Sequence, residues 1–89
     1  MARYMLVRHK VKDFAAWKAG YDAHQPKRVQ AGLEEKHLLH SASDPNEVVV
    51  LFEALDLDRA RAFAASTDLA DTMRKVGVVG QPDIWFLED

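Results

Sequence analysis

The chain contains no cysteine, and only four glycines and three prolines occur among its 89 residues. The lack of cysteine excludes disulfides, thiolate metal ligands and cysteine nucleophiles. Twelve basic residues face fourteen acidic ones, so no basic excess points to nucleic acid or an anionic membrane as the main partner. No apolar run approaches the roughly 20 residues of a membrane span, and the early charges argue against a signal peptide. We therefore expect one cytoplasmic domain, residues 1–89, with no membrane or nucleic-acid partner.

The most informative stretch is the apolar run Val48–Phe52, which follows the turn residues Asp44-Pro45-Asn46. Its three valines predict a β-strand rather than a helix. Side chains alternate along a strand, so both of its faces are apolar. A chain this short supplies enough helix to cover one face of a sheet, and a second copy is the simplest cover for the other. The sequence therefore predicts a homodimer joined sheet to sheet.

The remaining elements follow from the same patterns and from the positions of the turn residues. Pro26 is expected to stop or kink the first helix, and Gly77 to end the last one. In the second strand, regular alternation would place Leu33, Glu35, His37 and Leu39 on one face. The predicted strands are Tyr4–Val11, Leu33–Ser41, Glu47–Glu53 and Asp83–Leu87, and the predicted helices are Phe14–Gln25, Asp58–Ala65 and a third running from Ser66 to Val76. This order predicts an α+β, ferredoxin-like βαββαβ fold, with a four-stranded antiparallel sheet and helices on one face.

Several short runs along almost the whole chain then resemble one family. They are Arg8-His9-Lys10-Val11 with Asp13-Phe14 and Trp17-Lys18, Tyr21-Asp22 with His24, Arg28 with Ala31-Gly32, Asp44-Pro45-Asn46-Glu47, Ala60-Arg61-Ala62-Phe63-Ala64, and Gly77-Val78 leading to Pro82-Asp83 and Phe86-Leu87-Glu88. Together they resemble dimeric α/β-barrel proteins of the antibiotic biosynthesis monooxygenase superfamily, in its uncharacterised or cyclase-like branch. The resemblance implies two ferredoxin-like subunits whose sheets form one barrel.

The same resemblance leaves the activity open, because the superfamily includes cofactor-free monooxygenases, haem-degrading enzymes, lactone isomerases, polyketide cyclases and members with no known activity. Haem-degrading members combine an Asn on the first strand with a Trp and a proximal His in the second helical region. This chain has no Asn on its first strand and neither His nor Trp between Leu57 and Val76. We expect no haem or other cofactor, and no Glu/His spacing indicates a metal site.

Five residues are candidates for a site in the cleft between the helices and the sheet. Trp17, Tyr21, His24 and Arg28 follow one side of the first helix and its continuation, with spacings of four, three and four residues. His24 and His9 are the catalytic candidates, because an imidazole transfers protons near neutral pH. Trp17, Tyr21 and Arg28 are the substrate-binding candidates; Tyr21 would orient a phenol or carbonyl, and Arg28 would hold an anion or enolate.

A purely structural interpretation of the same residues is also open. Trp17 and Tyr21 would then be core aromatics, His24 and Arg28 would cap or solvate the helix end, and His9 would be hydrogen-bonded at the strand end. Two functions remain. One is a cofactor-independent monooxygenase or cyclase acting on a small aromatic or polyketide-like substrate, and the other is a non-catalytic dimeric module that binds a small molecule. Clustering of both histidines with Arg28 in an open cleft would favour the enzyme.

Overall fold

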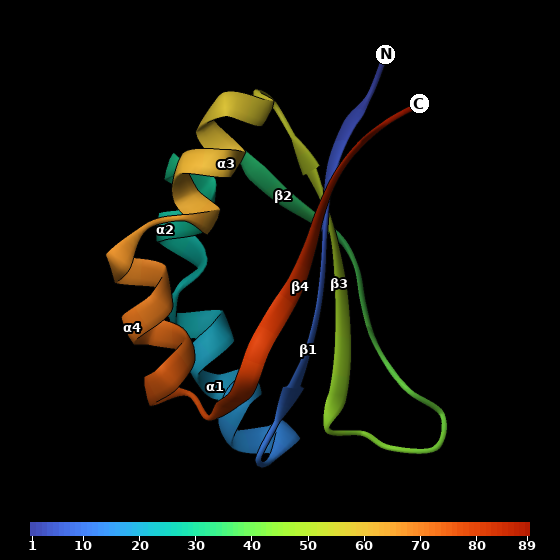
Figure 1. The fold of residues 1–89 in the computed structure, drawn as a ribbon, viewed down its shortest axis with the longest axis vertical. Helices are drawn as coiled ribbons and strands as arrows, with labels where there is room; N and C mark the ends of the chain where they lie inside the picture. The colour runs from blue at the N-terminus through green and yellow to red at the C-terminus, as the bar shows by residue number, and fades with distance from the viewer.

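The computed structural model describes residues 1–89 as an antiparallel sheet of four strands with every helix on one face (Figure 1). The strands are β1 (Arg3–Val11), β2 (Leu33–His40), β3 (Glu47–Ala54) and β4 (Val78–Glu88), and the helices are α1 (Phe14–Ala23), α2 (Gln25–Gln30), α3 (Leu57–Ala64) and α4 (Thr67–Lys75). In space the strands are ordered β2-β3-β1-β4. The predicted βαββαβ fold is confirmed, with each helical connection divided into two helices.

The central strands carry the core, as their alternation predicts. On β3, Val48, Val50 and Phe52 are buried beneath the helices. Val49 and Leu51 lie between them and are half-buried on the opposite face, which we call the open face. Because no helix of this chain covers the open face, its apolar side chains are the least sheltered part of the sheet (Figure 1).

The second strand departs from the predicted alternation. Its pairing with β3 shifts between Glu35 and His37, where Lys36 is the extra residue of a β-bulge. Leu33 and Glu35 therefore point to the helix side, whereas His37 and Leu39 point to the open face. The prediction that these four residues share one face was wrong, because one inserted residue reverses every side chain that follows it.

Side-chain caps define where three of the helices begin. The carboxylate of Asp13 accepts a hydrogen bond from the amide of Ala16 at 3.0 Å, and the hydroxyl of Ser66 accepts one from Leu69 at 3.1 Å. Asp56 caps α3 in the same way. Pro26 lies in the first turn of α2, where its missing amide proton breaks no hydrogen bond. The predicted interruption at Pro26 is confirmed, and none of the helices is both long and apolar enough to span a membrane.

The last strand is longer than predicted and irregular. It begins at Val78 rather than Asp83, and its pairing with β1 is interrupted between Arg8 and Lys10. Pro82 is tolerated within the strand because β4 is an edge strand and Pro82 lies at this interruption. Pro82 was therefore predicted to precede the strand, but it lies at an irregularity inside the strand.

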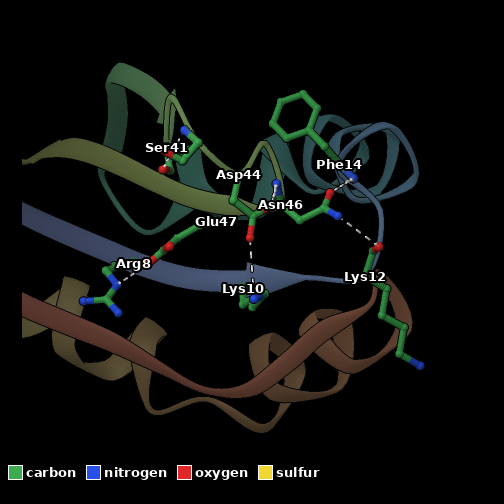
Figure 2. Close-up of polar contacts among 9 residues, drawn as sticks. Arg8, Lys10, Lys12, Phe14, Ser41, Asp44, Asn46 and Glu47 are labelled. Atoms are coloured by element: carbon green, nitrogen blue, oxygen red, sulfur yellow. Dashed lines mark hydrogen bonds and ion pairs between the residues drawn. The ribbon is translucent and has the colours of Figure 1, made fainter.

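Figure 2 shows how the turn between β2 and β3 holds the start of α1 in place. The side-chain oxygen of Asn46 accepts a hydrogen bond from the amide of Phe14 at 2.9 Å, and its amide nitrogen donates to the carbonyl of Lys12 at 3.4 Å. Ion pairs of Lys10 with Asp44 (3.5 Å) and of Arg8 with Glu47 (3.1 Å) flank this contact. These contacts position α1, which carries most of the candidate site residues.

Candidate functional site

A cavity of about 60 Å³ lies between the helices and the sheet. Its wall contains all five candidates from the sequence, His9, Trp17, Tyr21, His24 and Arg28. Helical spacing accounts for four of them, and the strand alternation that places Val7 beneath the helices also places His9 there. The structure thus brings the five side chains around one space. Apolar side chains from α3 and α4, among them Phe63, Leu69 and Met73, close it on the opposite side.

His9 is the most unusual side chain in this wall. It is only 8% exposed, and neither of its ring nitrogens has a hydrogen-bond partner. Its ring meets Trp17 edge-on, with ring centroids 5.4 Å apart. Burial lowers the pKa of His9 from 6.5 to about 4, because the charged form loses its solvation. The imidazole is therefore neutral at pH 7, and it is not hydrogen-bonded as the structural interpretation of the sequence required.

Trp17, Tyr21 and Arg28 form a continuous stack. The rings of Trp17 and Tyr21 lie 4.7 Å apart, and the Arg28 guanidinium carbon is 3.7 Å from the centre of the Tyr21 ring. Arg28 Nη1 donates to the Tyr21 carbonyl at 2.7 Å, and the Tyr21 hydroxyl donates to Glu35 at 2.7 Å. Burial is the main cause that raises the pKa of Tyr21, and the hydrogen bond to Glu35 raises it further. The phenol is therefore a neutral donor at physiological pH.

Arg28 is a buried cation without a carboxylate at ion-pair distance. The residue is 8% exposed, and its bond to the Tyr21 carbonyl caps the last turn of α1, as the structural interpretation of the sequence predicted. Burial lowers its pKa, while Tyr21 and the nearby carboxylates of Glu35 and Asp22 oppose that shift. With one of its five donors bonded to the Tyr21 carbonyl, the guanidinium retains capacity to bind an anionic group.

His24 lies between α1 and α2, and its side chain reaches Asp68 on α4 and Phe63 on α3. Its Nε2 atom is 3.3 Å from Asp68 Oδ2, and its ring stacks on Phe63 with centroids 5.9 Å apart. The His24 side chain is 12% exposed, whereas that of Asp68 is 62% exposed. An imidazole with a carboxylate at one nitrogen and a cavity in its surroundings is an arrangement suited to general base catalysis. The His24 side chain makes no capping hydrogen bond at the start of α2.

Two residues of the site were missed in the sequence. Asp68 was interpreted only as a favourable carboxylate in the first turn of a helix, which it also is. Glu35 was assigned to a face without a partner. Both contact residues that are distant in the sequence, and no local pattern indicates such contacts. The features that distinguish an enzyme from a binding module are mixed. The two histidines and Arg28 share one cavity, which favours an enzyme, but Trp17, Phe63 and Met73 help to fill it, which favours the module.

No protein-family model matches the sequence, and no curated protein is a detectable relative. Solved structures are similar in fold. A protein named as an antibiotic biosynthesis monooxygenase from Bordetella bronchiseptica superposes with a TM-score of 0.80 at 17% identity, over 99% of this chain and 96% of its own. One named in the same way from Nitrosomonas europaea gives 0.74 at 16% identity, over 99% of this chain and 89% of its own.

SnoaB from Streptomyces nogalater, described as a cofactor-independent oxygenase, superposes with a TM-score of 0.71 at 13% identity, over 99% of this chain and 94% of its own. At such identities the likeness establishes the fold alone. The chain therefore has the fold of the antibiotic biosynthesis monooxygenase structures, which is the fold that the sequence resemblance implied.

Proposed function

We propose that the chain binds a small aromatic molecule with an ionisable hydroxyl group, a phenol or an enol, in the helix–sheet cavity, and acts on it as a cofactor-independent oxygenase or cyclase. The observation that carries this proposal is His9, whose ring nitrogens are buried beside aromatic side chains without a partner. An unpaired buried polar group costs roughly 1–3 kcal/mol. A ligand hydroxyl or carbonyl would supply the missing hydrogen bond.

The proposed chemistry begins with removal of a proton from the ligand. His24 is the base, because Asp68 beside its Nε2 atom orients the ring and stabilises the imidazolium that forms. Arg28 stabilises the developing oxyanion with its unused donors. His9 remains neutral and positions the ligand by a hydrogen bond. The resulting electron-rich carbon reacts with dioxygen in an oxygenase, or with a carbonyl carbon of the same molecule in a cyclase.

The second candidate function is a non-catalytic module that binds a small molecule. The filling of the cavity by Trp17, Phe63 and Met73 favours it over catalysis. The remaining space of about 60 Å³ is much less than the roughly 150 Å³ of a cavity that holds one benzene ring. A ligand must therefore displace side chains to enter. The cover over the cavity is suited to such movement, since α4 has no fully buried side chain.

The test uses 2-naphthol, which combines an aromatic ring system with an acidic hydroxyl. Titration calorimetry measures its binding, and exchange of the proton at its C1 carbon with deuterated solvent measures proton abstraction. We expect His24→Ala to lose the exchange and Arg28→Gln to weaken binding by roughly tenfold, as for a lost charge-assisted hydrogen bond of about 1.5 kcal/mol. His40→Ala, at an exposed position at the end of β2 and outside the cavity wall, is the matched control.

The three results of this experiment lead to different conclusions. Binding with exchange that depends on His24 supports an enzyme. Binding without exchange in the wild type supports the binding module instead. If neither 2-naphthol nor its isomer 1-naphthol binds, or if both bind equally well to the Arg28 variant, the proposed site is wrong. Circular dichroism of each variant checks that the fold is retained.

We also propose that the protein is a homodimer through its open face. The alternation of β3 and β4 places Leu51, Trp85 and Leu87 there, and the last two are 44% and 41% exposed. Burying such a side chain contributes about 1.5–3 kcal/mol, whereas a lone subunit would expose a contiguous apolar surface. A second copy of the same face is the cover that the sequence predicted.

The oligomeric state is measured by light scattering at low micromolar concentration, which should give about twice the chain mass of 10.1 kDa. Leu51→Asp should produce monomeric, unfolded or insoluble protein, because it places a charge in the centre of the proposed interface. The control Glu88→Gln, at the exposed end of β4, should remain dimeric. A well-folded monomer from the unmodified sequence would refute the homodimer.

A further inference from the structure

A groove of about 590 Å³ runs along the outside of the molecule between α1, α2, β2 and the end of β3. Tyr21 and Arg28 line both this groove and the inner cavity. These two side chains therefore form the partition between a large outer space and a small inner one. Two exposed apolar residues, Val29 and Leu55, also line the groove.

The partition is held by two hydrogen bonds and by the stacking of Trp17, Tyr21 and Arg28. Arg28 is tied to the backbone of Tyr21, and the Tyr21 hydroxyl is tied to Glu35 on the edge strand β2. Glu35 is exposed and lies directly before the β-bulge. A shift of the Tyr21 ring would cost its hydrogen bond to Glu35 and its stacking against Trp17 and Arg28, and it would join the two spaces. The joined site would lie within the range of about 300–1,000 Å³ that is usual for small-molecule pockets.

The charges that line the groove determine which chemical group of a ligand can bind there. Its lining contains the carboxylates of Asp22, Glu34, Glu35 and Glu53, against the two cations Lys18 and Arg28. Asp22 is paired with Lys18 at 2.7 Å, and Lys36 pairs with Glu34 at 3.5 Å and Glu53 at 3.2 Å.

Glu35 differs from these three carboxylates, because it accepts only the Tyr21 hydroxyl and has no cation at ion-pair distance. An ammonium group in the groove would find in Glu35 a carboxylate free to pair with it, and its alkyl chain would find apolar contacts at Val29 and Leu55. An anionic group would instead meet the excess of carboxylates.

We propose that the groove is the outer half of the ligand site, and that the ligand is an aromatic alcohol carrying an amine-bearing chain, with its ring system in the cavity and its ammonium group beside Glu35. This inference rests on the proposed function for its inner half. It adds the partition formed by Tyr21 and Arg28 and the selectivity that Glu35 confers. The ligand passes between the two spaces where the Tyr21 ring now stands.

The experiment compares three 2-naphthols that differ only in a four-carbon chain at the 6-position. One has a plain butyl chain, one ends in an ammonium group and one ends in a carboxylate. Titration calorimetry of the wild-type protein measures the affinity of each compound.

We expect the ammonium compound to bind about two- to fivefold more tightly than the butyl compound, as for one exposed ion pair, and the carboxylate compound to bind more weakly. Glu35→Gln keeps an acceptor for the Tyr21 hydroxyl but removes the charge, so it should abolish the preference for ammonium. Glu88→Gln removes the same charge outside the lining of the groove and should keep the preference. Added salt should reduce it in the wild type.

The results separate this inference from the function on which it rests. If no 2-naphthol binds, the ligand site itself is wrong, and this inference fails with it. If the three compounds bind with equal affinity, or if Glu35→Gln retains the preference for ammonium, the groove is not part of the site although the cavity still is. Tighter binding of the carboxylate compound would show that Arg28, not Glu35, selects the charged group of the ligand.

Discussion

The burial of His9 predicts a pH dependence of stability that can be measured without any ligand. In the unfolded chain an imidazole takes up a proton near pH 6.5, whereas the pKa of His9 in the folded protein is about 4. Between these values the unfolded state binds more protons than the folded state. The contribution of His9 to the free energy of unfolding is therefore constant above about pH 6.5 and becomes less favourable as the pH falls toward 4.

The magnitude follows from the separation of the two pKa values. Each pH unit between 6.5 and about 4 changes the free energy of unfolding by about 1.4 kcal/mol, which gives a loss of about 3 kcal/mol across the window. Small domains are stable by only about 5–15 kcal/mol, so this loss is a large fraction of the total. Below pH 4 both states are protonated, and the contribution no longer changes.

The assay is urea unfolding of the wild type and His9→Phe between pH 7 and pH 4, at one fixed protein concentration. Carboxylates also titrate in this range, but they are common to both proteins and cancel in the difference. The wild type should lose about 3 kcal/mol relative to His9→Phe over the window, in line with the pKa shift. At pH 7 the variant should be at least as stable, because it removes two unpaired buried nitrogens. Parallel stability curves would refute the reasoning.

Two further predictions concern the packing around the site. Gly20→Ala should destabilise the fold by about 1–2 kcal/mol despite its better helix propensity, because an added Cβ would lie 2.0 Å from Val76 Cγ1; thermal unfolding measures the loss, and additive effects in the double variant with Val76→Ala would contradict the proposed clash. Asn46→Ala should cost about 1–2 kcal/mol, because it removes the hydrogen bonds to Phe14 and Lys12; Ser43→Ala in the same turn is the control, and an equal effect of both changes would contradict the role of Asn46.

The strands were predictable from sequence to the extent that their geometry is regular. On β3 the alternation of Val48 to Phe52 is uninterrupted, and the predicted faces are those observed. On β2 and β4 the pattern fails at Lys36 and around Pro82, where the pairing shifts. A period of two assumes that no residue is inserted. Because a bulge has no obligatory residue type, the sequence of β2 contains no local signal for it.

The candidate site was predictable only where its residues share an element or a simple periodicity. Helical spacing places Trp17, Tyr21 and Arg28 on one side, and their stacking confirms it. The contact of His24 with Asp68 joins residues 44 positions apart, so it depends on how α4 packs over α1. The closure of the cavity likewise depends on tertiary packing, and the sequence predicted an open cleft as readily as a filled one.

His9 is the residue at which the requirements of folding and of the proposed function diverge most clearly. Its neighbours on the buried side of β1 are Met5, Val7 and Val11, so an aliphatic residue would complete the stripe and leave no polar atom unpaired. The pairing of β1 with β4 is interrupted at this same residue. A fold optimised for stability alone would exclude both features, since each forfeits hydrogen bonding in the interior. Local departures of this kind are expected where a site must remain available to a ligand. The cavity beside His9 is therefore a stronger candidate for chemistry than the exposed positions of His37 and His40.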